Sequence, residues 1–597
     1  MSSRSLGSSR ASALTTLLAM VAILGIGPGA PAATPANAKS PLGINLLRVT
    51  YYSAEQPFLD VFKTSGVSQA TPSGWYTHGD STWDTGEAPY LQLDSAGYPK
   101  TLSASTADPH SPQLFTSVGV VLLRELPKAD AGVGLPYRPG RYVVLYDGQG
   151  KLSYGFDARL LSSAPGRDVI DVTPSSGGID LRITATDPKH TGNYLRNIRL
   201  VKAEEEALLR AGQVFRPGFL TLLQRFSVVR GMPWLNVNGD GGRIASWSSR
   251  PLPSDAGWGS ERGVPLEVLL QLCVALRADC WLNMPHQASD DYIAQAARLA
   301  HATLGVDQNA YVEFSNEVWN GSFEQYNYAV AQGKAQWPAA SVTPSEYNRN
   351  WFGMRTAQMC DIWTAIWGGD AARVLCVLGA QAASTFTATE SLKCPLWAGA
   401  GHGPCARHNI KAVAIAPYFG DAVPEAWTSQ ADGGLASLFA SMTTQNDASV
   451  PAGGWLAAAS RYEAAYHAAL AAYHLPLIGY EGGQSFVGSP RYREGSPLVT
   501  LYFAANRDPR MGTAYTAALN AWRANGGQIW VLFQDICASS QYGEWGALES
   551  FQDSVDPLSK APPKWQAIQN FIASNPCWWP GCAGHVAAAI APTAERR

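Results

Sequence analysis

The order of buried strands and amphipathic helices constrains the fold of this chain more than any other feature. From about residue 206 onward, short apolar runs alternate with segments of helical periodicity. Such runs are typical of strands buried on both faces of a parallel sheet. Seven of them are expected, over residues 226–230, 280–283, 311–317, 373–378, 412–416, 477–481 and 528–533.

Amphipathic helices are expected between these strands, over residues 265–276, 290–304, 345–367, 460–473 and 515–525, with Ser289 as an N-cap. An eighth strand over 42–46, followed by a helical segment at 57–64, completes an eightfold repeat. This order predicts a (β/α)8 TIM barrel. A doubly wound open sheet explains the alternation too, but gives no reason for carboxylates at the ends of the fourth and seventh strands.

The alternation of strands and helices stops between the first and second predicted barrel strands. Short strands with no helix between them are expected over 118–123, 140–146, 151–156, 168–172, 178–184 and 194–201. This pattern predicts an all-β, sandwich-like domain inserted into the barrel, which holds polysaccharide or serves as a lid or packing module. The expected boundaries are 39–110 for the first barrel strand, helix and loops, 111–205 for the insert, 206–575 for the rest of the barrel and 576–597 for a tail.

The N-terminal residues resemble a secretory signal. Arg4 and Arg10 precede an apolar run, and Ala36-Asn37-Ala38 offers a small-residue cleavage site, so residues 1–38 are predicted to be cleaved. The run is shorter than the roughly 20 residues of a membrane span, which makes an uncleaved anchor the weaker alternative. We expect a mature chain that is secreted or periplasmic and has no membrane contact.

The net charge and the aromatic content of the chain limit which binding partners are expected. A net charge of −3 gives no reason to expect nucleic acid or anionic lipid. The 20 Trp and 24 Tyr are an unusually high content of aromatic residues. Such rings stack on sugar faces, but they also fill protein cores, so the counts fit either role.

Nine cysteines suit an oxidising compartment. The pairs Cys394/Cys405 and Cys577/Cys582 are the strongest disulfide candidates. Two further pairs are open, Cys273/Cys280 and Cys360/Cys376, which would leave Cys537 over. None has zinc-ligand spacing with a matching histidine pair, so no metal site and no cofactor are expected.

Two of the predicted strands end in a carboxylate. Glu317 closes the run 311–317 and Glu481 closes the run 477–481. Barrel strands deliver their carboxyl ends to one face, so these two side chains should meet there. One proton donor and one carboxylate that faces the anomeric carbon are what glycoside hydrolysis requires.

At these residues the chain resembles clan A of the glycoside hydrolases, whose members are retaining TIM-barrel enzymes. The resemblance covers the whole barrel and rests on an Asn-Glu pair ending the fourth strand and a Glu ending the seventh. It implies that Glu317 is the acid/base and Glu481 the nucleophile. It also implies that Asn316 holds the substrate 2-hydroxyl, and that Arg230 and Tyr418 flank the nucleophile.

The chain departs from the clan at the eighth strand. The clan ends that strand with a Trp that forms a sugar platform, whereas this chain has Phe533-Gln534-Asp535, so Gln534 becomes a candidate there. Three other candidates have structural alternatives. His286 binds a sugar hydroxyl or is a satisfied buried histidine, and Trp234 and Trp319 form platforms or only pack loops.

Glu313 lies two residue pairs before Glu317 in the same predicted strand, so both side chains should point to the same side of the strand. Because Glu313 is deeper in the barrel, it is expected to face the barrel interior against a basic partner.

No Gly-x-Ser-x-Gly elbow, phosphate loop or His-Glu-x-x-His motif occurs. The predicted function is a secreted retaining glycosidase that acts on a β-linked polysaccharide or oligosaccharide. A non-catalytic glycan-binding protein and a transglycosylase with the same glutamates are the alternatives.

Overall fold

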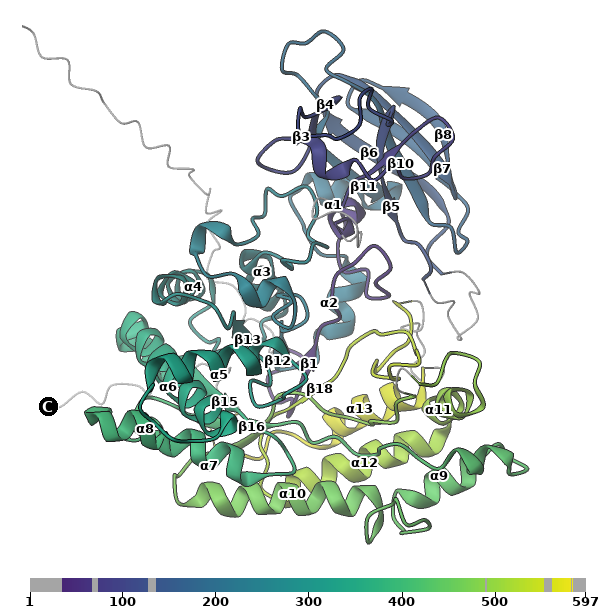
Figure 1. Cartoon of the computed structure of the whole chain (residues 1–597). Coiled ribbons are helices and arrows are strands. Elements are labelled where there is room, and N and C mark those ends of the chain that lie inside the picture. The colour runs from purple at the N-terminus through teal and green to yellow at the C-terminus, as the bar shows by residue number, and fades with distance from the viewer. Residues whose placement is uncertain are drawn as a thin grey trace, which may run out of the picture. The chain divides into compact units, whose positions relative to one another are not determined.

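The computed structural model describes residues 35–66, 74–126, 136–488, 491–551, 561–580 and 582. Its main element is a closed barrel of eight parallel strands (Figure 1). β1 pairs with both β12 and β18, which closes the barrel. In chain order the strands are β1 (Leu42–Asn45), β12 (Val228–Arg230), β13 (Asp279–Met284), β14 (Ala310–Phe314), β15 (Val374–Gly379), β16 (Ala412–Ile415), β17 (Leu477–Gly479) and β18 (Trp530–Leu532).

All eight predicted barrel strands are confirmed. The structure ends five of them earlier than predicted, namely β1, β14, β16, β17 and β18, and Glu317, Glu481 and Phe533 lie just beyond β14, β17 and β18. The chain therefore leaves the sheet before it reaches these side chains, and they lie on the turns at the carboxyl end of the barrel.

The five predicted helices are confirmed as α3 (Leu266–Leu276), α4 (Asp290–Thr303), α6 (Pro344–Trp367), α10 (Gly454–Ala471) and α12 (Pro509–Ala524). Ser289 caps α4 by accepting a hydrogen bond from the backbone N–H of Tyr292. The other α-helices are α1 (Glu206–Arg210), α2 (Pro217–Leu223), α5 (Glu324–Gln336), α7 (Thr385–Lys393), α8 (Pro395–Trp397), α9 (Leu435–Ser441), α11 (Pro497–Arg507) and α13 (Pro563–Ser574).

The helix predicted at 57–64 is only a 3₁₀ turn, η1 (Val61–Thr64). Phe58 forms a β-bridge with Phe215, which holds the start of the segment in an extended conformation. Asp60 then begins η1 by accepting the N–H of Phe62, and the same carboxylate accepts the N–H of Leu200. One short turn thus joins the first barrel strand to the inserted domain.

The inserted domain consists of two four-stranded sheets, β2-β5-β10-β7 and β11-β6-β9-β8, and the hairpin β3-β4. Their side chains enclose a core of their own, which includes Val118, Leu181 and Leu200. The strands are β2 (Tyr76–His78), β3 (Leu91–Leu93), β4 (Pro99–Ala104), β5 (Ser117–Leu122), β6 (Gly140–Asp147), β7 (Gly150–Phe156), β8 (Ala158–Ala164), β9 (Arg167–Val172), β10 (Ile179–Thr186) and β11 (Arg196–Lys202).

The six strands predicted in this domain are present. β8 was missed because Leu160 and Leu161 are adjacent and both exposed, so its sequence does not alternate. The predicted boundary at residue 111 is too late, because β2 pairs with β5 and belongs to the same sheet.

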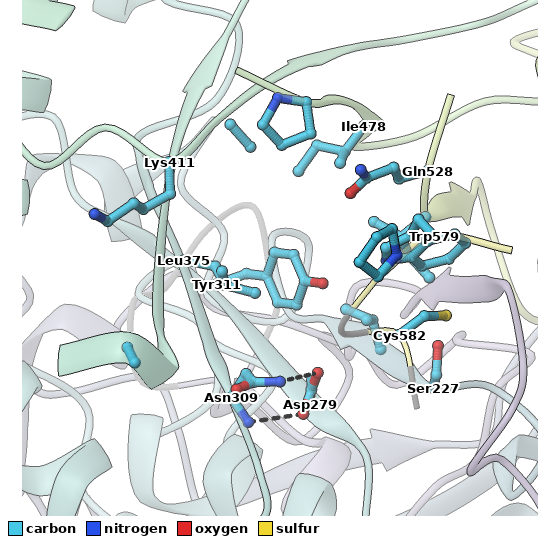
Figure 2. Close-up of a pocket in the computed structure, with 16 residues that line it drawn as sticks. Ser227, Asp279, Asn309, Tyr311, Leu375, Lys411, Ile478, Gln528, Trp579 and Cys582 are labelled. Atoms are coloured by element: carbon cyan, nitrogen blue, oxygen red, sulfur yellow. Dashed lines mark hydrogen bonds between the residues drawn. The ribbon is translucent and has the colours of Figure 1, made fainter. Parts of the chain in front are cut away.

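The amino ends of the barrel strands surround a pocket of about 240 Å³. Tyr311 and Gln528 line it, and Trp579 covers one side (Figure 2). Asn37 lies at the same end, 1% exposed, and its amide donates to the carbonyl oxygens of Phe226 and Leu276. The predicted processing boundary after residue 38 therefore falls within packed chain.

Four disulfides match the predicted pairs, Cys273–Cys280, Cys360–Cys376, Cys394–Cys405 and Cys577–Cys582, and Cys537 is free. None of the helices within the described residues is long and apolar enough to cross a membrane.

Candidate active site

Arg230, the last residue of β12, lies at the centre of the candidate site. Its guanidinium is fully buried, with Nη1 3.0 Å from Glu481 Oε2 and Nη2 2.8 Å from Glu313 Oε2. It also donates to the amide oxygens of Asn45 and Asn316, at 3.1 and 2.9 Å. One cation therefore joins groups from the ends of four barrel strands.

Glu313 faces the barrel interior, as predicted. Its Oε2 accepts hydrogen bonds from Trp281 Nε1 at 2.9 Å and Asn283 Nδ2 at 2.8 Å, in addition to the contacts with Arg230. A Cβ on Gly379 would lie only 3.1 Å from the Glu313 carboxylate, so a glycine on β15 leaves the room that this group occupies. Glu313 thus lies beneath the candidate site and holds Arg230 in position.

Glu481 lies just past β17 and is nearly buried. Besides the contact of Oε2 with Arg230, its Oε1 accepts the hydroxyl of Tyr418 at 3.2 Å. Tyr418 lies just past β16. The two partners that the resemblance placed beside Glu481 are therefore both in contact with it.

Glu317 is held by different groups. Its Oε1 accepts the hydroxyl of Tyr480 at 2.7 Å, and its Oε2 accepts the side-chain amide of Asn320 at 2.8 Å. The backbone turns sharply here, since Ser315 and Glu317 have φ of +61° and +44°. Such conformations cost about 1–3 kcal/mol each and persist where the surrounding contacts impose them.

The two carboxyl groups differ in their electrostatic surroundings. Burial raises the pKa of Glu481, and the guanidinium of Arg230 opposes that rise. Burial also raises the pKa of Glu317, with the neutral donors Asn320 and Tyr480 as the main opposing groups. Of these two carboxyl groups, only Glu481 is in direct contact with the cation, which favours a negative charge on Glu481.

Asn316 connects this centre to a neighbouring loop. Its amide donates to Asn238 Oδ1 at 3.2 Å while its oxygen accepts from Arg230. Gln325, on α5, donates both to Asn238 Oδ1 at 2.8 Å and to the backbone oxygen of Asn316 at 2.6 Å. These contacts fix the orientation of the Asn316 amide next to the two glutamates.

No protein-family model matches the chain, and no curated protein matches it. Solved structures do match. A broad specificity endoglucanase, GH5-4, from Clostridium acetobutylicum is 12% identical, with 60% of this chain and 88% of that chain covered and a TM-score of 0.32. A 4-O-alpha-L-rhamnosyl-beta-D-glucuronidase from Fusarium oxysporum 12S is 13% identical, covering 60% and 65%, with a TM-score of 0.33.

An endo-1,4-beta-xylanase from Caldicellulosiruptor owensensis is 8% identical, with 59% of this chain and 92% of that chain covered and a TM-score of 0.31. The case for an activity rests on the side chains described above.

Two predicted sugar contacts are wrong. Trp234 is fully buried, packs against Phe58 and Phe215, and donates its indole N–H to Glu55, so no ring face is open to a ligand. His286 is 3% exposed, so it is not open to a sugar hydroxyl, but its Nδ1 has no hydrogen-bond partner within the described residues, so it is not the satisfied histidine of the structural alternative either. Burial lowers the pKa of His286 to about 4, so this ring is neutral at neutral pH.

The eighth strand has an aromatic neighbour that the sequence did not reveal. Trp545 is half-buried, and its ring lies 5.5 Å from that of Tyr418 and 5.7 Å from that of Phe533. The backbone N–H of Gln534 donates a hydrogen bond to the carbonyl oxygen of Trp545. Trp319, next to Glu317, is also half-buried and remains a candidate platform.

Sequence reasoning missed Asn45, Tyr480 and Asn320. Asn45 ends β1 in the same way that Arg230 ends β12, so its position at a strand end was a signal that could have found it. Tyr480 and Asn320 carried no signal, because their roles depend on which way the chain turns after β17 and β14.

Proposed function

We propose that the protein is a retaining glycoside hydrolase that cleaves a β-linked polysaccharide or oligosaccharide. The observation that supports it most is the division of partners between two glutamates, Glu481, which is buried, and Glu317, which is half-buried. Glu481 contacts a cation and a hydroxyl, while Glu317 contacts only neutral donors. Paired carboxyl groups with separate environments are what an acid and a nucleophile need.

In the first step, the Glu481 carboxylate attacks the anomeric carbon. The glycosidic C–O bond breaks, and Glu317 gives its proton to the leaving oxygen. Arg230 and Tyr418 hold Glu481 in place, and Arg230 favours its ionised form before the attack. Asn316, fixed by Arg230 and Gln325, is placed to bind a substrate hydroxyl.

In the second step, Glu317 acts as a base. It removes a proton from water, the water oxygen attacks the anomeric carbon, and Glu481 leaves as a carboxylate. Two inversions retain the anomeric configuration. Tyr480 and Asn320 suit this reversal, because their hydrogen bonds stabilise the ionised form of Glu317 that the second step requires.

We further propose that the enzyme acts outside the cytoplasm, as the N-terminal sequence and four disulfides favour. The steps above use amino-acid side chains and one water molecule.

The test is release of reducing ends from a panel of β-linked polysaccharides, with proton NMR of the first product. We expect at least one substrate to be cleaved with its anomeric configuration retained. Binding without cleavage by the wild-type chain would favour a glycan-binding protein, and transfer to added sugar without free reducing ends would favour a transglycosylase. A first product of inverted configuration would contradict the two-step mechanism.

A further inference from the structure

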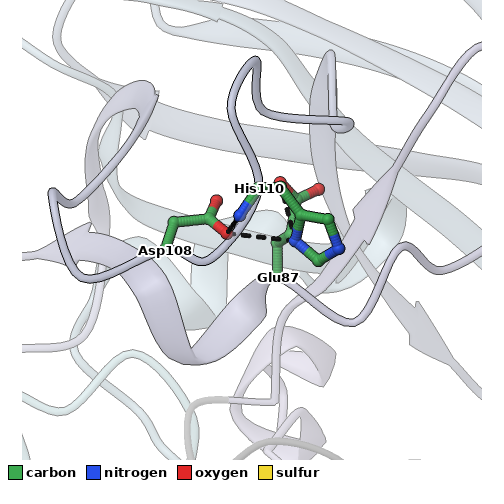
Figure 3. Close-up of side chains that lie close together, drawn as sticks. All are labelled: Glu87, Asp108 and His110. Carbon is green, nitrogen blue, oxygen red and sulfur yellow. Dashed lines mark hydrogen bonds and ion pairs between the residues drawn. The ribbon is translucent and has the colours of Figure 1, made fainter.

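Three possible ligand atoms meet in the inserted domain, far in sequence from the two catalytic candidates. Glu87 directly precedes η2 (Ala88–Tyr90), and Asp108 and His110 lie in the loop between β4 and β5. One carboxylate oxygen of each acid and a ring nitrogen of His110 lie within 4.8 Å of one another. Figure 3 shows the three side chains pointing toward one another.

The backbone holds Glu87 firmly in this position. Its N–H donates to Thr77 Oγ1 at 3.1 Å, and its Oε1 accepts the N–H of Leu114 at 2.9 Å. The side chain of Glu87 has no exposed surface. A buried carboxylate fixed at one oxygen presents the other oxygen in a defined direction.

The carboxyl groups of Glu87 and Asp108 contact each other, and two of their oxygens accept no hydrogen bond from any other group within the described residues. They are Glu87 Oε2 and Asp108 Oδ2, and the side chain of Asp108 is only 3% exposed. The ion pairs that both acids form are with His110 alone among the described residues, at 3.9 and 3.1 Å. Unpaired buried carboxylate oxygens are costly, and a bound cation is one way to satisfy them.

We propose that one divalent transition-metal ion binds to Glu87, Asp108 and His110, and that this ion is Zn²⁺. Two carboxylate oxygens, one imidazole nitrogen and one water complete the four-coordinate shell that Zn²⁺ prefers. Ca²⁺ takes six to eight oxygen ligands, which this set does not offer. The half-exposed His110 gives the ion a path from solvent.

The ion would act as a structural clamp. Glu87 comes from the segment after β2, whereas the other two ligands come from the loop before β5. Binding joins these segments at the point where the two carboxyl groups meet. Zn²⁺ should therefore stabilise the folded protein without taking part in glycoside cleavage.

The test is zinc titration of the tag-free full-length chain after treatment with a chelator, followed by calorimetry and by thermal unfolding. We expect one tightly bound ion per chain, a higher Tm with Zn²⁺, and weaker binding of Ca²⁺. Glu87→Gln and His110→Ala should each weaken Zn²⁺ binding by at least about 100-fold, since even outer-shell changes cost 10–100-fold. The visible spectrum of bound Co²⁺ should be lost in parallel.

The matched control is His301→Ala. His301 pairs with Asp370 at 2.8 Å, but no second carboxylate joins them in the described structure, so this variant should bind Zn²⁺ as the wild type does. His110 is half-exposed, so His110→Ala carries the test if Glu87→Gln fails to fold. A wild-type chain that binds no Zn²⁺, binds Ca²⁺ more tightly, or binds Zn²⁺ unchanged after His110→Ala would overturn the proposal.

Discussion

The two ends of the barrel use buried polar groups in opposite ways. At the carboxyl end, one arginine holds Glu313 and Glu481, and Glu317 lies beside them on neutral donors. At the amino end, the polar side chains bind backbone groups. Asn37 and Gln308 donate to backbone carbonyl oxygens of α3 and of the residues just before β12 and β13, and Asp279 accepts the backbone N–H of Asn309.

This difference separates chemistry from stability. The carboxyl end concentrates groups that can change charge, at the cost of burying two carboxylates, Glu313 and Glu481, around one cation. The amino end uses its polar side chains, the carboxylate of Asp279 included, to satisfy backbone groups. Substitutions at the first end should therefore alter turnover or its pH dependence, whereas those at the second should alter only the free energy of unfolding.

The largest effect is expected from Glu481→Gln. Loss of the nucleophile should lower kcat on the order of 10⁶-fold, as in enzymes whose nucleophile is removed. The measurement is turnover of the best substrate from the panel. Glu463→Gln is the control, because Glu463 is also buried and hydrogen-bonded, to Asn525, but lies on α10 away from the site. Equal losses in both variants would show a general folding defect instead.

Glu317→Gln should discriminate between substrates. General acid catalysis contributes ~10²–10⁴-fold, so substrates with poor leaving groups should slow by that factor. Activated aryl glycosides need little protonation and should lose far less in the first step. Steady-state rates on a leaving-group series provide the measurement, and equal losses across the series would remove Glu317 from the acid role.

Arg230→Met should affect both stability and pH dependence. It leaves Glu313 and Glu481 buried without their counter-charge, which we expect to cost about 3–5 kcal/mol of unfolding free energy. In folded enzyme the Glu481 pKa should rise, so the acidic limb of kcat/KM should move to higher pH. Arg159→Met, which breaks an exposed pair with Asp171, should cost about 0–1 kcal/mol in the same denaturant experiment.

If Arg230→Met folds but its acidic limb does not move, Arg230 serves Glu313 and the barrel interior rather than the nucleophile.

Tyr480→Phe is expected to move the opposite limb. The Tyr480 hydroxyl lowers the pKa of Glu317 by donating to its ionised form, so its removal should raise that pKa further. Glu317 would then stay protonated to higher pH, and the basic limb of kcat/KM should move up by about one unit, the equivalent of roughly 1.4 kcal/mol. Tyr466→Phe, which removes a buried hydroxyl bonded to the backbone between β15 and α7, should leave both limbs in place.

The smallest effect on catalysis is expected from Asn37→Ala. Loss of the amide leaves the carbonyl groups of Phe226 and Leu276 unpaired, which should lower the unfolding free energy by about 1–3 kcal/mol. kcat should not change. For the same reason we expect processing to cut before Asn37, and N-terminal sequencing of the exported protein would identify the cut. A mature chain that starts at residue 39 would show that these contacts are dispensable.

Much of the fold follows from the sequence because barrel strands are short, apolar and separated by helices. The same pattern identified Glu317 and Glu481, since each ends a predicted strand, whereas Arg230 was identified through the family resemblance. The pattern failed where a side chain's direction depends on tertiary packing. Trp234 is of the residue type that forms sugar platforms, but the rings of Phe58 and Phe215 pack against it.

The metal candidates were missed for a related reason. Glu87, Asp108 and His110 lie in loops, and their spacing carries no motif. Only the pairing of β2 with β5 brings the two segments together.

The most direct test of the central claim is to trap the covalent intermediate. An activated 2-deoxy-2-fluoro glycoside matching the cleaved sugar should inactivate the enzyme, and mass spectrometry of the digested protein should find the sugar ester on Glu481. The Glu317→Gln variant should be labelled at the same residue, because an activated leaving group needs little acid assistance. Labelling of another carboxylate, or an active enzyme that never forms an adduct, would contradict the assignment of Glu481 as the nucleophile.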